Sequence, residues 1–162
     1  MPSGKTHTRI DVLFLAFVVG CAVWFRQDLT GIFGRDRFTE LAATYAMAYL
    51  LSTFLLSPDL DLRENQSKKN WGLLRYLWGP YAGLFKHRGI SHTPFLGTLT
   101  RLIYLLVAVY VVLAVLNALF DLNLGLSPRS LVATDRQLAL TALSGICTPD
   151  LLHVLTDKVS RR

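Results

Sequence analysis

Long apolar runs alternate with short polar stretches along the chain, and the runs predict four helices. The longest are residues 102–120 and 41–58, with nineteen and eighteen residues free of charge. A bilayer-spanning helix needs about 20 apolar residues, so both runs are long enough to cross a membrane. Residues 12–25 and 137–149 are shorter, and each is expected to extend through a polar end that neighbouring helices shield. The sequence therefore predicts helices over residues 9–26, 38–57, 93–120 and 136–157 and an interfacial connection over residues 58–92, all within one helical membrane domain, 1–162.

Composition supports a membrane protein. Hydrophobic residues make up 52% of the chain and charged residues 17%, with a mean hydropathy of +0.38. A soluble domain is typically about 25% charged. The net charge of +6 comes from basic residues grouped between the apolar runs, which favours anionic lipid head groups as partners and leaves no specific nucleic acid expected. Cys21 and Cys147 lie within apolar segments without metal-type spacing, so both are expected to be packing residues.

The distribution of basic residues predicts the orientation. Of 17 Lys and Arg residues, 11 fall in the two termini and the 58–93 connection, and five fall in the opposite loops. The positive-inside rule then places both termini in the cytoplasm. An alternative is a lipoprotein-like signal, because Lys5 and Arg9 precede an apolar stretch that ends in "VVGC" at Cys21.

The connection has a pattern of its own. Trp71, Leu74, Trp78 and Tyr81 recur at near-helical intervals beside basic residues. Such a segment suits an amphipathic helix at the level of the head groups. A helix and loop packed over the bundle would give the same pattern, so both interpretations stay open.

All four histidines are expected at one end of the bundle. His7 precedes the first helix, His87 and His92 precede the third, and His153 falls late in the fourth. Because successive helices alternate in direction, these positions meet at the same end. The second helix arrives there with "SPDLDL", which holds Asp59 and Asp61, although a Ser-Pro-Asp turn is also a common way to end a helix.

The fourth helix carries the clearest metal-ligand spacing. Asp150, His153 and Asp157 lie at i, i+3 and i+7 and share one helix face. A histidine and a carboxylate four residues apart can bind one metal ion together. A hydrogen-bonded cap at the membrane surface is the alternative.

The stretch "KHRGISHTP" adds imidazoles and cations. Gly89 permits a tight bend that would turn His87 and His92 toward one centre. Lys86 and Arg88 flank the first histidine and could neutralise a phosphate-like substrate. The alternative is a positively charged flank with satisfied histidines.

The four motifs "TH", "PDLD", "HRGISH" and "HVLTD" are similar to those of small bacterial membrane proteins described as metal-binding, which are abundant in cyanobacteria. They also resemble inner-membrane metal-dependent hydrolases with PDxDH, HRGxTH and HxxxD motifs, and more distantly the zinc-dependent phospholipase C and single-strand nuclease superfamily. Leu62 stands where the hydrolases have His, and Asp150 is not part of the shared motif. The resemblance implies a bacterial plasma or thylakoid membrane and these site residues: His7, Asp59, Asp61, His87, His92, His153 and Asp157.

Together these features predict an all-α, integral-membrane bundle of about four helices with a metal site at its cytoplasmic end. The leading hypothesis is a hydrolase that uses a divalent metal, zinc by the resemblance, on a phosphoester or similar ester. Asp61 would be a base or would support a metal ligand from behind, and Lys86 and Arg88 would bind the anion. A non-catalytic metal-binding protein and a structural membrane subunit are the alternatives. The expected metal ligands are His7, Asp59, His87, His92, His153 and Asp157.

Overall fold

The computed structural model describes residues 4–62, 65–85, 89–93, 95–122, 124–125 and 135–160, and every regular element among them is helical. The all-α prediction is therefore confirmed. Four long helices account for most of the described chain, and short helices connect them. The elements are α1 (Gly4–Trp24), α2 (Arg26–Phe33), α3 (Arg35–Leu55), the 3-10 helix η1 (Pro58–Asp61), α4 (Gln66–Asn70), the 3-10 helix η2 (Gly72–Leu77), α5 (Trp78–Leu84), the 3-10 helix η3 (Ile90–His92), α6 (Leu96–Phe120) and α8 (Arg136–Val159).

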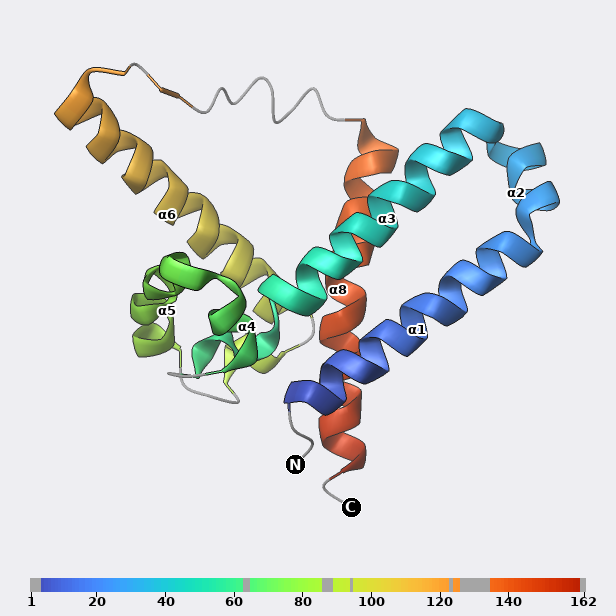
Figure 1. Ribbon diagram of the computed structural model, residues 1–162, viewed down its shortest axis with the longest axis horizontal. Coiled ribbons are helices and arrows are strands. Elements are labelled where there is room, and N and C mark those ends of the chain that lie inside the picture. The colour runs from blue at the N-terminus through green and yellow to red at the C-terminus, as the bar shows by residue number, and fades with distance from the viewer. Residues whose placement is uncertain are drawn as a thin grey trace.

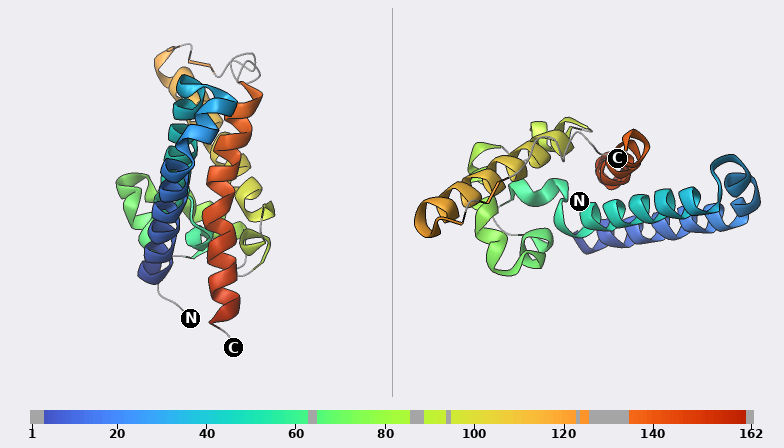
Figure 2. Two further views of the ribbon diagram at one scale, coloured as in Figure 1. Left: turned by 90° about the vertical axis from the view of Figure 1, so that its right-hand side faces the viewer. Right: turned by 90° about the horizontal axis from the view of Figure 1, so that it is seen from above.

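Three of the long helices lie side by side and the fourth diverges from them. Figures 1 and 2 show α1 and α3 running alongside each other and α8 crossing both at an angle, with both chain termini at the same end. Helix α6 leans away from α3 and α8, and its buried residues, Gly97, Thr98 and Arg101, all lie in its first two turns. The described helices thus form a three-helix group that α6 joins only at the end where the termini lie.

Helices α3 and α8 approach most closely at Gly145. A Cβ atom added there would lie 2.7 Å from the carbonyl oxygen of Tyr45 and 2.9 Å from the Cβ of Ala48. Only a residue without a side chain fits this spacing, as is common where helices pack through small residues. The contact is reinforced one turn away by Ser52, whose Oγ donates to the carbonyl oxygen of Ile146 at 2.8 Å.

An aromatic cluster packs the connection against the start of α6. Trp78 and Tyr81 of α5 are fully buried, and Tyr104 of α6 packs against both rings. The Trp71 Nε1 donates to the carbonyl oxygen of Leu55 at 2.8 Å, which fixes the connection to the end of α3. The packed interpretation of this segment therefore holds for Trp78 and Tyr81, while Leu73 and Tyr76 stay 87% and 69% exposed.

Four helices are long and apolar enough to cross a membrane: α1, α6, α8 and a stretch that begins with α3, over Arg35–Asp61. Their large hydrophobic side chains face outward, and none of the most apolar window of α6 is buried inside the molecule. In water such a surface would be unfavourable, because each Å² of exposed apolar area costs about 25 cal/mol.

Two element boundaries differ from the expectation. Helix α1 begins at Gly4, more than a turn before residue 9, because the polar residues ahead of the apolar run continue the same helix. The chain after Trp24 forms the separate short helix α2, which hydropathy did not predict. Helices α3, α6 and α8 begin and end within three residues of the expected limits.

Candidate metal centre

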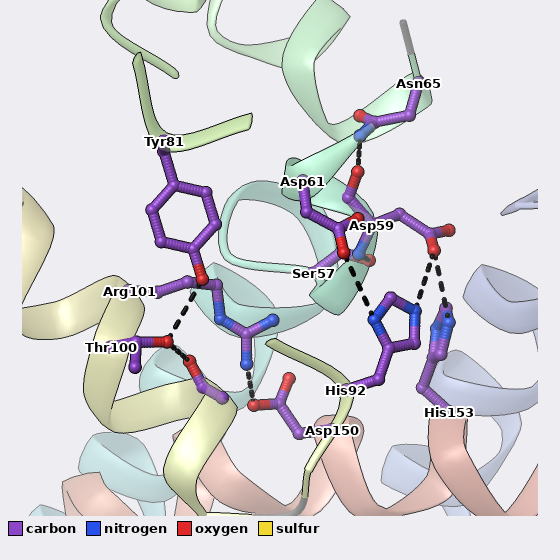
Figure 3. A network of polar contacts seen from close by, with 11 residues as sticks. Ser57, Asp59, Asp61, Asn65, Tyr81, His92, Thr100, Arg101, Asp150 and His153 are labelled. Atoms are coloured by element: carbon purple, nitrogen blue, oxygen red, sulfur yellow. Dashed lines mark hydrogen bonds and ion pairs between the residues drawn. The ribbon is translucent and has the colours of Figure 1, made fainter. Parts of the chain in front are cut away.

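The polar motifs meet at the end of the molecule where the termini lie. Helix α1 supplies His7, η1 supplies Asp59, η3 supplies His92 and α8 supplies His153 and Asp157. Figure 3 shows His92 and His153 with their imidazole rings directed at the Asp59 carboxylate. Four segments that are distant in sequence thus place three histidines and two carboxylates together, as alternating helix directions required.

Local capping explains how η1 presents its aspartates. The Oγ of Ser57 accepts a hydrogen bond from the Asp59 backbone N–H at 3.4 Å, and Pro58 occupies the first turn. Serine and proline are both favoured at a helix start. The serine hydroxyl pairs with a backbone N–H that has no partner within the helix, and proline has no backbone N–H that would need one. The Asn65 side-chain amide also donates to the Asp59 carbonyl oxygen. The short helix therefore holds Asp59 and Asp61 in fixed directions.

One triad consists of Asp59, His92 and His153. The Asp59 Oδ1 lies 3.5 Å from the Nε2 atoms of both His92 and His153. Two ligands that each lie ~2.0–2.2 Å from one ion are at most about 4.4 Å apart, so the Asp59 carboxylate could share an ion with either imidazole.

A second triad consists of His7, His153 and Asp157. The His7 Nε2 lies 3.3 Å from the Asp157 Oδ1, and the rings of His7 and His153 stack with centroids 3.8 Å apart. Within each triad the candidate ligand atoms lie within 4.8 Å of one another. Because His153 belongs to both triads, the five residues form one connected centre.

The chemistry of the centre fits a divalent cation. Imidazole nitrogens and carboxylate oxygens are ligands of zinc, and also suit iron and manganese. The His7 Nδ1 is buried and has no hydrogen-bond partner among the described residues. Two stacked imidazoles repel each other when both are protonated, so the stacking of His7 and His153 favours the neutral form, which is the form that binds metal.

Asp61 lies behind His92. Its side chain is fully buried, and its Oδ2 lies 3.4 Å from the His92 Nδ1 on the side of the ring away from Asp59 (Figure 3). Burial alone would lower the pKa of His92, but the Asp59 and Asp61 carboxylates outweigh it and raise the pKa to about 9. A carboxylate on the far nitrogen of a ligating histidine fixes the tautomer and strengthens the ligand.

Asp150 is engaged elsewhere. Its Oδ2 accepts hydrogen bonds from the Thr98 hydroxyl and from the Arg101 guanidinium, both on α6, and Figure 3 shows the Arg101 contact. The pair is almost completely buried, with Arg101 at 1% and Asp150 at 3% exposure. This ion pair ties the start of α6 to α8, one helical turn from His153, and gives Asp150 a positioning role that its sequence spacing did not reveal.

Asp11 is a site residue that the sequence interpretation missed. It lies one turn beyond His7 on α1, is 6% exposed and lines the same cavity as the triads while belonging to neither. The Tyr49 hydroxyl donates to its backbone carbonyl at 2.9 Å, which fixes this turn of α1 against α3. The signal was the i, i+4 spacing to His7, the same spacing that marked His153 and Asp157.

The centre opens into a cavity of ≈400 Å³. Most of the residues that line it are polar, with hydroxyl groups from the end of α3 and the amide of Gln66 from α4, and the volume suffices for a small ligand. Lys86, His87 and Arg88 lie outside the described residues. Apart from the triads, the residues that matter most along the walls are Lys5, Asp11, Ser52, Thr53, Gln66 and Ser67.

Comparison with known proteins agrees with this centre. A protein-family model described as "Uncharacterized metal-binding protein (DUF2227)" matches residues 2–162. A protein of Aquifex aeolicus (strain VF5), which carries the name "Uncharacterized protein", is 38% identical over 126 aligned residues, and the match covers 72% of this chain and 89% of the relative. No solved structure matches the chain significantly.

Proposed function

Because the chain belongs to the family of uncharacterized metal-binding proteins (DUF2227), we propose that it is an integral-membrane, metal-dependent hydrolase that acts on a phosphoester or similar ester. The observation that carries the proposal is that four of the five residues of the two His/Asp triads, His7, Asp59, His153 and Asp157, line one cavity of ≈400 Å³. A metal held only for stability needs no adjoining space for a ligand, whereas a hydrolase must admit its substrate and water.

Each residue has a distinct role in the proposed reaction. The two triads hold the metal, which when bound polarises an ester oxygen and lowers the pKa of water. Asp61 favours the His92 tautomer that carries its proton on Nδ1. The Nε2 atom, which faces Asp59, is then free to bind the metal. Asp11 and Asp150 are the described cavity carboxylates that neither triad uses, and Asp150 is paired with Arg101, so we assign Asp11, in place of Asp61, to accept a proton from the attacking water. Lys86 and Arg88 are assigned, as the sequence predicts, to bind the anionic phosphate-like group of the substrate.

The second candidate is a non-catalytic metal site. The two triads adjoin through His153, so ligands of one could complete the coordination of an ion held by the other, and a fully ligated ion has no open position for substrate. In that case the metal would join the ends of α1, α3 and α8 and contribute only to folding.

An activity assay with matched variants separates the two candidates. Purified protein would be assayed for bound metal by plasma mass spectrometry and for hydrolysis of p-nitrophenyl and bis(p-nitrophenyl) phosphate, with and without a chelator. His153→Ala, which removes a ligand from both triads, should lose both metal and activity, whereas Asp28→Ala, at an exposed aspartate on α2, should lose neither. Metal-loaded wild-type protein that hydrolyses no ester would favour the non-catalytic candidate.

We also propose that the four apolar helices cross a bacterial inner membrane with both termini in the cytoplasm. The outward apolar surface and the excess of basic residues at the metal end support this orientation. The test uses single cysteines, Lys69→Cys or Asp28→Cys, in a variant without Cys21 and Cys147. In whole cells a membrane-impermeant thiol reagent should label the cysteine of Asp28→Cys and not that of Lys69→Cys. The reverse pattern would invert the topology.

A further inference from the structure

The cavity of the metal centre continues into a second hollow at the surface. The outer hollow has a volume of ≈290 Å³ and lies between the start of α1, the end of α3 and α4. Both hollows share wall residues from all three elements, so they adjoin. The shared residues are Lys5, Thr8, Thr53, Gln66 and Ser67. A ligand that reaches the metal donors from this side must pass these residues.

Thr53 presents an unused hydroxyl at the junction. It is 6% exposed, and its Oγ1 has no hydrogen-bond partner among the described residues. Helical threonines ordinarily donate to the carbonyl four residues earlier, as Thr148 and Thr156 do to Ser144 and Leu152 at 2.7 and 2.8 Å. Because buried polar groups are normally satisfied, a hydroxyl free of that bond on the wall of both hollows points to a polar ligand.

The charge of the outer hollow differs from that of the metal centre. Lys5 and Arg9 lie four residues apart on α1, both are exposed, and neither forms an ion pair with a described residue. No acidic residue is among the described residues that line the outer hollow. The inner cavity, in contrast, is lined by carboxylates that would be neutralised by a metal. Of these two adjoining hollows, the outer one has a wall of net positive charge, which suits an anion.

We propose that the outer hollow is an anion subsite, in which Lys5 and Arg9 bind a phosphate-like group of the ligand and Thr53 donates to it or to the atoms beside it. This inference rests on the proposed function, since it specifies the substrate as a molecule with an anionic group separate from the ester that reaches the metal donors. Such a group could belong to a phospholipid head group or to a soluble phosphorylated molecule.

Inorganic phosphate is the probe that tests the subsite. Full-length, metal-loaded protein in phosphatidylcholine nanodiscs would be titrated by calorimetry. The double variant Lys5→Ala/Arg9→Ala should weaken phosphate binding about tenfold or more, because charge-assisted hydrogen bonds are lost. The control Arg26→Ala/Arg35→Ala removes the same charge from another surface hollow, at the opposite end of α1. Phosphate binding should be unchanged there. Equal affinities in wild type and both double variants would overturn the subsite.

Thr53→Val separates ligand binding from folding. Removal of an unsatisfied buried hydroxyl should leave the melting temperature unchanged or higher, while phosphate affinity falls several-fold. A lower melting temperature with unchanged affinity would show that the hydroxyl is structural and contradict its role. Nanodiscs with phosphatidylglycerol distinguish the source of the anion: competition with phosphate indicates a lipid head group, and no competition indicates a soluble ligand.

The subsite and the hydrolase can fail separately. If wild-type protein hydrolyses p-nitrophenyl phosphates but Lys5→Ala/Arg9→Ala leaves KM for bis(p-nitrophenyl) phosphate and phosphate affinity unchanged, the subsite is wrong and the proposed activity stands. If no ester is hydrolysed but phosphate binding follows the variants as expected, the subsite stands and the hydrolase does not.

Discussion

His153 is the residue whose removal should affect the metal centre most, because both triads depend on it. Its ring is 4% exposed, stacks on His7 and meets His92 edge-on with centroids 5.8 Å apart. His153→Ala therefore removes a ligand from each triad, whereas His7→Ala and His92→Ala each leave one triad intact. We expect His153→Ala to lose nearly all bound metal and the two single-triad variants to keep a reduced amount.

The magnitude follows from linkage. An ion at a free concentration 100 times its dissociation constant stabilises the fold by about 2.7 kcal/mol. If His153→Ala weakens binding about 1,000-fold, about a tenth of the sites stay filled and the same ion contributes only about 0.1 kcal/mol, so about 2.6 kcal/mol of metal-linked stability disappears. For a chain of this size a chelator should lower the melting temperature of wild type by about 5–10 °C. The same chelator should barely change that of His153→Ala.

Comparison with and without a chelator isolates the metal. Loss of the His153 ring also leaves a cavity, but that cost is present in both conditions and cancels in the chelator shift. Melting would be followed by scanning fluorimetry in detergent, alongside metal content by plasma mass spectrometry. If His153→Ala retains the metal content and the chelator shift of wild type, the two triads do not hold the metal, and the hydrolase proposal loses its basis.

Three further predictions concern the surroundings of the centre. Gly145→Ala should destabilise the fold by about 1–3 kcal/mol in thermal unfolding because its Cβ would overlap α3. Gly20→Ala, with nothing within 4 Å, should be neutral or slightly stabilising; equal effects would contradict the close packing. Arg101→Met should cost about 3–5 kcal/mol by leaving the Asp150 charge buried alone, and adding Asp150→Leu should recover most of it; no recovery would refute the pairing. Metal binding should release the proton that His92 holds below its pKa of about 9, so affinity should fall about tenfold per pH unit below 9. Calorimetry in two buffers of different ionisation enthalpy measures that release, and heats independent of buffer would refute it.

Hydropathy and connectivity were sufficient for the framework. The uncharged run 102–120 lies within α6, and the late position of His153 in α8 brought it to the same end as His92. Polar residues continue a helix as readily as apolar ones when they face a site, which is why the start of α1 was placed too late. That error also concealed Asp11, since its partner His7 was not recognised as helical.

Side-chain pairing across the fold was beyond the reach of the sequence. Arg101 and Asp150 are 49 residues apart, and no local pattern indicates that they meet. Asp59 and Asp61 are likewise two similar carboxylates in one turn, and only the tertiary position of η3 places the first toward His153 and the second behind the His92 ring. Local spacing decides which residues share a helix face, whereas packing decides what each of them contacts.

The α3–α8 contact determines the geometry of the centre. Asp59 follows the end of α3 by a few residues, and His153 lies eight residues after Gly145 on α8, or about 12 Å along the helix axis. The spacing of these two helices at Gly145 therefore sets how near the Asp59 carboxylate comes to the His153 imidazole, now 3.5 Å. His92 depends on a different contact, because η3 leads into α6, which the buried Arg101–Asp150 pair attaches to α8. Each triad thus depends on α8 as the common support, and this explains why the shared ligand, His153, belongs to that helix.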